Sequence, residues 1–230
     1  ALPLLSIWVS IGALSWNDGI LAILRCPDDI VGERRMRRLT APQGGSDDGV
    51  LLVALLSLFD GTGFARLAIE EVIAGMEGVR LVAAAYVESD PVLAEAVRAL
   101  WADELRQGRT NVPYVHLAGD VWNLLRRSGN GPTPIESFAS GLPAGCRVVL
   151  MAGSPCQDLT FQGNGRGNKG LCGSRSVSFY SIPVVGWGLQ AIRGDIVVHS
   201  IAENAGSMLP HFKAAMLDAL GALPAPSHAP

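Results

Sequence analysis

Residues 50–63 read VLLVALLSLFDGTG, and this stretch determines the fold class of the chain. The apolar run over 50–58 has the length of a strand that is buried on both faces. A glycine-rich turn over 59–63 follows it, and residues 64–76 have helical periodicity, with one side made by Leu67, Ala68, Val72 and Ile73. A buried strand, a glycine turn and a helix form the opening unit of a doubly wound α/β sheet.

The rest of the chain repeats this alternation. Further strands are predicted over 80–87, 112–117, 147–152 and 195–202, and helices over 91–107, 176–193 and 208–220. Pro183, Gly186 and Gly188 are expected to break or kink the second of these helices, and residues 128–145 to form a loop-rich crossover. The predicted fold class is therefore α/β, with a doubly wound, mostly parallel sheet of Rossmann-like topology.

Composition along the chain predicts three regions: an N-terminal extension and linker over 1–49, a folded core over 50–222 and a flexible tail over 223–230. Residues 1–24 are apolar and nearly long enough to span a bilayer. The positive segment that precedes the apolar part of a signal peptide is missing in front of them. A membrane role is therefore not favoured.

The overall composition is that of a protein with a large core, since 49% of the residues are apolar and 17% are charged. The net charge of −3 provides no basic field, so binding to nucleic acid has to rest on local basic residues or on missing parts. The cysteines and histidines show no metal-ligand spacing, so no metal is predicted. We expect reduced thiols and an intracellular protein, nuclear if eukaryotic and otherwise cytoplasmic.

Polar or glycine-rich residues follow each of the five predicted strands, and they read FDGTG (59–63), ESD (88–90), GD (119–120), SPCQ (154–157) and ENAG (203–206). Ligands of open α/β sheets bind outside the carboxyl ends of the strands, so these residues predict one site. Glycines let backbone amides approach a ligand at a helix N-terminus. Glu88 stands where nucleotide-binding folds hold ribose hydroxyls, and we expect Asp90 to cap the next helix and leave Glu88 free.

Cys156 directly follows Pro155 at the end of a predicted buried strand. Proline fixes its own backbone angle and restrains the residue before it, so this turn is expected to be stiff. Stiffness suits a nucleophile, which must meet its target with little positional error. The alternative is that Cys156 is a small buried residue without chemistry.

In order and spacing the strand ends resemble the motifs of the cytosine carbon-5 DNA methyltransferases. FDGTG is similar to the first motif, ESD to the second, the Asp120 turn to the third, GSPCQDLT (153–160) to the catalytic fourth, and ENAG to the sixth. The DLT ending is closest to the de novo animal branch. The resemblance implies a transferase that moves the methyl group of S-adenosylmethionine to carbon 5 of a cytosine flipped out of DNA.

The resemblance also implies the roles of the catalytic residues. Cys156 would attack carbon 6 of the base, because carbon 5 alone is a poor nucleophile. Glu203 would contact the exocyclic amine and ring nitrogen 3, and to do so it should carry or share a proton, which partial burial encourages. Asn204 would help to fix the turn there. Further contacts to the base and DNA are expected from Ser154, Gln157, Arg166 and Lys169.

For the cofactor, the resemblance implies that the backbone of the glycine turn holds the methionine part, through Phe59, Asp60, Gly61, Thr62 and Gly63. Glu88 with Ser89 would take the ribose, and Asp120 the adenine amino group. Pro155 would border the cofactor and shape the pocket around the flipped base. The glycine-rich loop after Cys156, which holds Arg166 and Lys169, is expected to be a mobile lid.

The resemblance covers about residues 50–222, and nothing in the sequence matches the family's later arginine-rich motif, its target-recognition region or its last strands. The fifth predicted strand, or a neighbour, is therefore expected to be an exposed edge. The chain would be a fragment, be completed by a partner chain, or have decayed. A non-catalytic relative and an RNA cytosine methyltransferase remain alternatives. A nicotinamide dehydrogenase is disfavoured, because FDGTG lacks the GxGxxG spacing.

Overall fold

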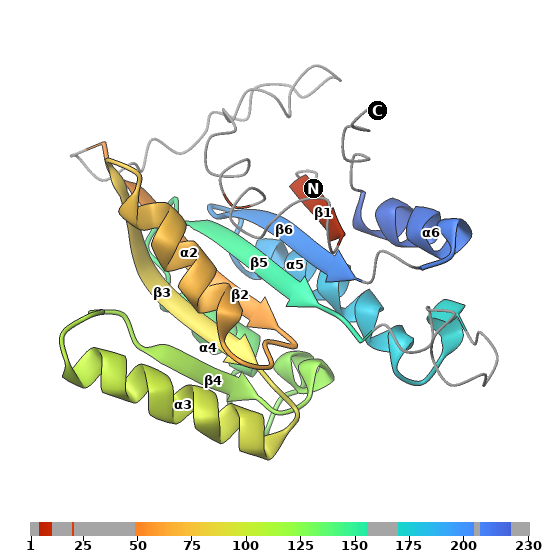
Figure 1. Cartoon of the computed structure of the whole chain (residues 1–230), viewed down its shortest axis with the longest axis horizontal. Coiled ribbons are helices and arrows are strands. Elements are labelled where there is room, and N and C mark those ends of the chain that lie inside the picture. The colour runs from red at the N-terminus through yellow and green to blue at the C-terminus, as the bar shows by residue number, and fades with distance from the viewer. Residues whose placement is uncertain (1–4, 11–19, 21–48, 156–169, 205–207, 222–230) are drawn as a thin grey trace.

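The computed structural model describes residues 5–10, 20, 49–155, 170–204 and 208–221, and it contains one sheet in which every neighbouring pair of strands is parallel (Figure 1). The strand order is β1-β6-β5-β2-β3-β4. The strands are β1 (Leu5–Ser10), β2 (Leu51–Leu58), β3 (Val79–Val87), β4 (Tyr114–Ala118), β5 (Arg147–Gly153) and β6 (Val197–Asn204).

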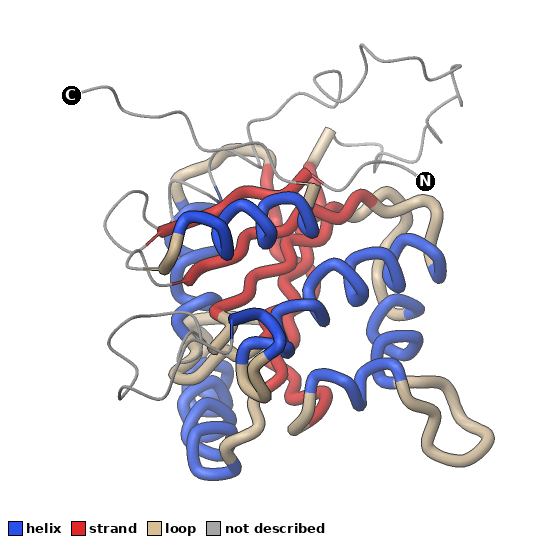
Figure 2. The backbone as a smooth tube through the Cα atoms, turned by 90° about the vertical axis from the view of Figure 1, so that its right-hand side faces the viewer, coloured by secondary structure: helices blue, strands red, loops and turns tan. Residues whose placement is uncertain are grey.

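Helices cover both faces of this sheet, which Figure 2 shows as a central layer of strands. The α-helices are α2 (Phe64–Ala74), α3 (Pro91–Arg106), α4 (Pro134–Ser140), α5 (Ser181–Ile192) and α6 (Pro210–Leu220). Short 3-10 helices are η2 (Val121–Leu125), η3 (Gly170–Cys172) and η4 (Ser176–Tyr180).

The side chains of β2 alternate between two hydrophobic cores. Val53 and Leu55 pack in the core that includes α2 and α3, whereas Leu56 and Leu58 pack in the core that includes α4, α5 and α6. All four side chains are fully buried, as the apolar run requires. The prediction of a doubly wound, parallel α/β fold is confirmed.

The order of the strands defines where a ligand would bind. From β2 the chain moves outward through β3 to β4, and it then returns to the other side of β2 through β5 and β6. The switch in direction therefore lies between β2 and β5, which pair in parallel from Val53–Arg147 to Leu58–Ala152. Sheets of this kind bind ligands in the crevice at the carboxyl ends of the two strands that flank the switch.

The N-terminal strand β1 is the main difference from the predicted fold. Residues 5–10 pair in parallel with β6, from Leu5 beside His199 to Ser10 beside Asn204. The outer edge of β6 is therefore covered, contrary to the expectation of an exposed edge at this strand. The predicted boundary between residues 49 and 50 does not separate this part of the extension from the sheet.

Two helical segments also differ from the prediction. The crossover over 128–145 contains α4, whose N-cap Thr133 and Glu136 form a reciprocal capping box at its first turn. The helix α5 continues through Pro183, Gly186 and Gly188 without a break. Pro183 is tolerated because it lies in the first turn, where amide hydrogens have no intrahelical acceptor.

Smaller corrections concern burial and strand length. Leu67, which was expected on the apolar side of α2, is 47% exposed, and the fully buried Arg66 takes its place on that side. β6 extends through Glu203 and Asn204, so both residues belong to the end of the strand and not to a turn after it. Among the described residues, no helix is both long and apolar enough to cross a membrane.

Candidate functional site

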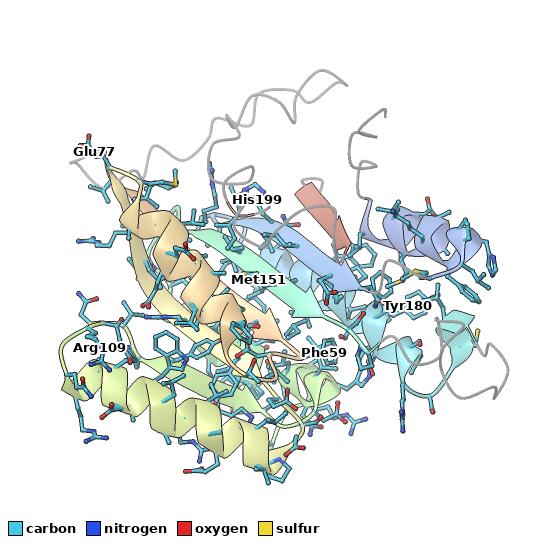
Figure 3. All side chains as sticks on the ribbon, in the orientation of Figure 1. Phe59, Glu77, Arg109, Met151, Tyr180 and His199 are labelled. Atoms are coloured by element: carbon cyan, nitrogen blue, oxygen red, sulfur yellow. The ribbon has the colours of Figure 1, made fainter. Side chains whose placement is uncertain are left out.

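The candidate site lies at the carboxyl ends of the strands, where the ends of β2, β3, β4, β5 and β6 lie side by side. In Figure 3, Phe59 lies at the end of β2 and Tyr180 beyond the end of β5, while Glu77 lies at the opposite, amino ends of the strands. All strands run in the same direction, so the polar residues after each strand are brought to one edge.

The glycine turn is tied to the end of β3. The amide N–H groups of Phe59 and Asp60 both donate to the carbonyl oxygen of Val87, at 3.0 and 3.3 Å. The turn requires left-handed backbone at three positions, because φ is 59° at Phe59, 60° at Gly61 and 82° at Gly63. Glycine adopts such angles without steric cost. Among the described residues, Phe59 is the one non-glycine residue with a positive φ.

The N-terminus of α2 faces this turn without a side-chain cap, since its N-cap residue is Gly63. The first amides of a helix lack intrahelical acceptors and carry a partial positive charge. Apart from its chain neighbours, no atom of the described residues lies within 4 Å of the place where a Cβ atom at Gly61 would stand. The amides of Phe59, Asp60, Gly61 and Gly63 already have protein acceptors, so a ligand could use the space beside Gly61 but not these amides.

Glu88 is less free than the sequence predicted. Its Oε2 atom accepts from the amide of Gly61 at 2.8 Å, and its Oε1 atom accepts from the amide of Asp90 at 2.8 Å. The side chain is 8% exposed. Each carboxylate oxygen keeps a second lone pair, so Glu88 can still accept from a ligand hydroxyl while it holds the turn. Asp90 caps α3 as expected, by accepting from Val92 and Leu93.

The end of β4 lies against the backbone of Glu88. His116 in β4 places its Nε2 atom 3.2 Å from the carbonyl oxygen of Glu88, and a Cβ atom at Gly119 would stand 3.9 Å from the same oxygen. Asp120 is exposed, and its Oδ1 atom accepts from the amide of Trp122. Asp120 therefore caps η2 and keeps its Oδ2 atom for a ligand. Ser89 and Thr62 are exposed at the same edge.

On the other side of the switch, Glu203 stands beside Gly153. The two residues are partners in the parallel register of β5 and β6. A Cβ atom at position 153 would lie 3.4 Å from Oε2 of Glu203, so the carboxyl group reaches across the neighbouring strand. Glu203 is half-buried, and this burial raises the pKa of its carboxyl group above the ordinary value. A raised pKa favours the protonated form, which can donate a hydrogen bond.

Asn204 joins the ends of β5 and β6. Its Nδ2 atom donates to the carbonyl oxygen of Ser154 at 3.1 Å and to Oγ of Ser154 at 2.9 Å. Asn204 is 1% exposed and Ser154 is 5% exposed, so both bonds are shielded from water. Asn204 therefore ties the end of β6 to the segment that leads into the half-buried Pro155, and its expected role in fixing the turn at Glu203 stays a prediction.

Four of the predicted site residues, Cys156, Gln157, Arg166 and Lys169, lie outside the described residues, as does most of the predicted lid. The roles assigned to them stay predictions. The described residues contain no group of three or more histidine, cysteine, aspartate or glutamate side chains that could hold a metal ion.

Sequence reasoning missed three buried residues near the glycine turn, namely Ser57, Arg66 and Tyr114. Ser57 is the single polar residue in the run VLLVALLSL, and this position could have indicated a partner for it. Its Oγ atom donates to Oδ1 of Asp60 at 2.7 Å. Nothing in the local sequence indicates that Arg66 or Tyr114 would be buried beside it.

Comparison with known proteins adds no assignment. No model of a known protein family matches the chain, and no curated protein is found to be similar to it.

Proposed function

We propose that this chain is a DNA (cytosine-5)-methyltransferase that uses S-adenosylmethionine. The observation that supports the proposal is the junction of the two strand ends that carry the catalytic motifs. Glu203 lies beside Gly153, and Asn204 hydrogen-bonds Ser154, two residues before Cys156. These contacts would hold a base-binding glutamate and a nucleophile on the same pocket.

The cofactor half of the site fits the group that the proposal requires. The open space beside Gly61 could take the methionine part, and the N-terminus of α2, whose N-cap Gly63 makes no side-chain cap, suits its carboxylate. The remaining lone pairs of Glu88 suit ribose hydroxyls, and the Oδ2 atom of Asp120 suits an amino group. When bound, S-adenosylmethionine supplies an electrophilic methyl group on its sulfonium.

The residues of the chain would then act on the flipped cytosine. The thiolate of Cys156 adds to carbon 6, and the electron pair of the ring double bond makes carbon 5 nucleophilic. Glu203, whose pKa is raised by its partial burial, would in its protonated form donate to ring nitrogen 3 and offset the charge that develops in the ring. Carbon 5 would take the methyl group with S-adenosylhomocysteine as the leaving group, and it would then lose its proton to water. The electron pair of that bond would restore the ring double bond as the bond between carbon 6 and sulfur breaks and the thiolate is released.

The strand order by itself also fits a dinucleotide-dependent dehydrogenase. The paired ends of β5 and β6 favour methyl transfer, because a carboxyl group with a raised pKa lies beside the strand that leads into the sequence Ser-Pro-Cys, and a thiol together with a proton donor suits the activation of a base. This distinction depends on chemistry at the site and not on the fold.

Covalent trapping tests the proposal. Duplex DNA that contains 5-fluorocytosine is incubated with the protein and S-adenosylmethionine, because the fluorine blocks the final proton loss. We expect a covalent complex that is lost in Cys156→Ala and kept in Cys146→Ala, since Cys146 is a buried thiol directly before β5 and burial raises its pKa to about 12. Trapping that persists in Cys156→Ala would refute the assignment of Cys156 as the nucleophile.

Two further outcomes separate the alternatives. Binding of S-adenosylhomocysteine without trapping on DNA or RNA would indicate a non-catalytic relative. Trapping on a 5-fluorocytosine RNA hairpin, but not on the DNA duplex, would indicate an RNA methyltransferase. The absence of both binding and trapping would refute the proposed function.

A further inference from the structure

The peptide group between Glu88 and Ser89 lies just beyond the point where the pairing of β3 with β4 ends. The last residues that pair are Val87 and Ala118, so the carbonyl oxygen of Glu88 follows the ladder. The side chain of His116 takes the place of a ladder donor there, because its Nε2 atom lies 3.2 Å from this oxygen. A carbonyl oxygen can only accept, so Nε2 of His116 carries the proton of the hydrogen bond.

An irregularity in β4 and an aromatic neighbour define the position of the His116 ring. Tyr86 lies opposite His116 in the register and Val87 lies opposite Ala118, so Leu117 is left out of the register. A bulge of this kind changes the direction of the side chains beside it. The ring of Tyr86 lies 5.0 Å from the His116 ring between centroids. The donor that reaches Glu88 is therefore held by its own strand and by a ring on the next one.

The backbone is anchored on both sides of the Glu88 Cα atom. On the β2 side, the carbonyl oxygen of Val87 accepts from the amides of Phe59 and Asp60, at 3.0 and 3.3 Å. On the β4 side, the carbonyl oxygen of Glu88 accepts from His116. Each peptide unit is planar, so anchoring the units before and after one Cα atom fixes both of its backbone angles. These angles determine where the Glu88 side chain starts.

The carboxyl group of Glu88 depends on this anchoring, because it is shared between two amides. Its Oε2 atom accepts from Gly61 and its Oε1 atom from Asp90, both at 2.8 Å. The lone pairs that remain on the two oxygens point in directions that these bonds set. A ligand with two neighbouring hydroxyl groups can donate to both oxygens only while the carboxyl group keeps this position.

We propose that His116 is a positioning residue for the ribose of the cofactor, and that it acts through the peptide group of Glu88. The inference rests on the proposed function, because it concerns the cofactor of the same site. His116 holds the carbonyl oxygen of Glu88 and does not touch the ligand. Without this hydrogen bond the peptide group can rotate, and the carboxyl group spends less time in the position that accepts from the ribose hydroxyl groups.

The test compares two substitutions that differ in the donor. His116→Phe keeps a ring beside Tyr86 and removes the donor, whereas His116→Gln places an amide nitrogen at about the reach of Nε2. The affinity for S-adenosylhomocysteine is measured by titration calorimetry. We expect the dissociation constant to rise about fivefold in His116→Phe, which is the effect of one lost hydrogen bond, and to stay within about twofold of the original protein in His116→Gln.

The dependence on the ribose hydroxyl groups separates this role from a general effect on stability. The same titrations are made with the 2′,3′-dideoxy analogue of S-adenosylhomocysteine, which lacks both hydroxyl groups. The original protein should bind the analogue more weakly than S-adenosylhomocysteine. His116→Phe should bind the analogue as well as the original protein does, because the contact that the substitution loosens is not made. Such a double cycle measures the coupling between the side chain and the hydroxyl groups.

Tyr86→Phe is the matched control. It keeps the ring beside His116 and removes a hydroxyl group that donates to the carbonyl oxygen of Ala94 in α3 at 2.8 Å. Its removal should lower the free energy of unfolding and leave the affinity for both ligands unchanged. If His116→Phe does not fold, His116→Ala removes the same donor and is tested in its place.

The outcomes are distinguishable from a failure of the proposed function. An original protein that does not bind S-adenosylhomocysteine would refute the proposed function and this inference together. If the original protein binds it, equal binding by His116→Phe would refute the inference alone. Equal weakening of both ligands in His116→Phe, or an original protein that binds both ligands equally, would overturn the link to the ribose. A His116→Gln variant as weak as His116→Phe would overturn the role of the donor.

Discussion

Gly153 and Glu203 are partners across two parallel strands, and a Cβ atom at residue 153 would stand 3.4 Å from Oε2 of Glu203. The glutamate thus lies over a residue that has no side chain. This relationship determines how much room the carboxyl group has at the carboxyl edge of the sheet.

Substitutions at Gly153 should affect the reaction in proportion to their size. Gly153→Ala places a methyl group in van der Waals contact with Glu203, and we expect trapping on 5-fluorocytosine DNA to slow by less than about tenfold. Gly153→Val fills the space that the carboxyl group occupies and should slow it by about 100-fold. Circular dichroism should show that both variants keep the fold. Equal rates in Gly153→Val and the original protein would contradict a role for Glu203 at this position.

Glu203→Gln should lower the trapping rate by about 100-fold, because the amide cannot shift a proton to the base. The pKa of Glu203 is raised by burial, so the folded protein favours the protonated carboxyl group. The contribution of this group to stability is therefore fully present below the unfolded pKa, near 4.5, and is lost as the pH rises through the higher folded value. The unfolding free energy of Glu203→Gln, measured with urea between pH 4 and 8, should not show this decrease with rising pH. An unchanged pH dependence would show that Glu203 does not titrate in this range.

The pair Asn204 and Ser154 offers a graded test of the junction between β5 and β6. Asn204→Ala removes two buried hydrogen bonds and leaves both Ser154 oxygens without that donor, so we expect a loss of about 2–3 kcal/mol of unfolding free energy. Ser154→Ala removes one of the bonds and should cost about 1 kcal/mol. Trapping should weaken in the same order. If Ser154→Ala were the more damaging variant, the backbone bond would not be the main anchor.

The two left-handed glycines of the turn provide a further comparison. Gly61→Ala introduces a Cβ atom into open space, so its cost is that of a positive φ alone, about 1 kcal/mol. Gly63→Ala has the same backbone cost, and its Cβ atom would also stand 3.2 Å from Nε1 of the buried Trp101. We expect a total loss of about 2–3 kcal/mol in urea unfolding for Gly63→Ala. Equal losses would indicate that Trp101 can move aside without cost.

Local patterns in the sequence were sufficient for most of the sheet. The apolar run over 50–58 and the turn at 59–63 predict a strand and a ligand-binding turn, because only glycine accepts the backbone angles at Gly61 and Gly63 without cost. Strands that follow one another through a short crossover tend to be neighbours, which holds for β2, β3 and β4. The return of β5 to the other side of β2 does not follow from this rule and was not predicted.

The features that could not be predicted depend on partners that are distant in the sequence. The burial of Arg66 requires Thr110 and Val112, which approach it only in the folded protein. β1 pairs with a strand almost two hundred positions later, and no local pattern reports such a partner. The helix α4 could have been predicted, because Thr133 and Glu136 have the spacing of a capping box. It was missed because the surrounding glycines and prolines favour the prediction of a loop.

The pairing of β1 with β6 also dictates an order of events during synthesis. Residues 5–10 leave the ribosome well before their partner strand at 197–204. Until then the first strand has no neighbour, and afterwards the newly formed β6 has an open edge until β1 arrives. Closing so large a loop is slow compared with local folding. The nascent protein therefore passes through an interval in which two unpaired strand edges can meet other chains, and chaperones would act during that interval.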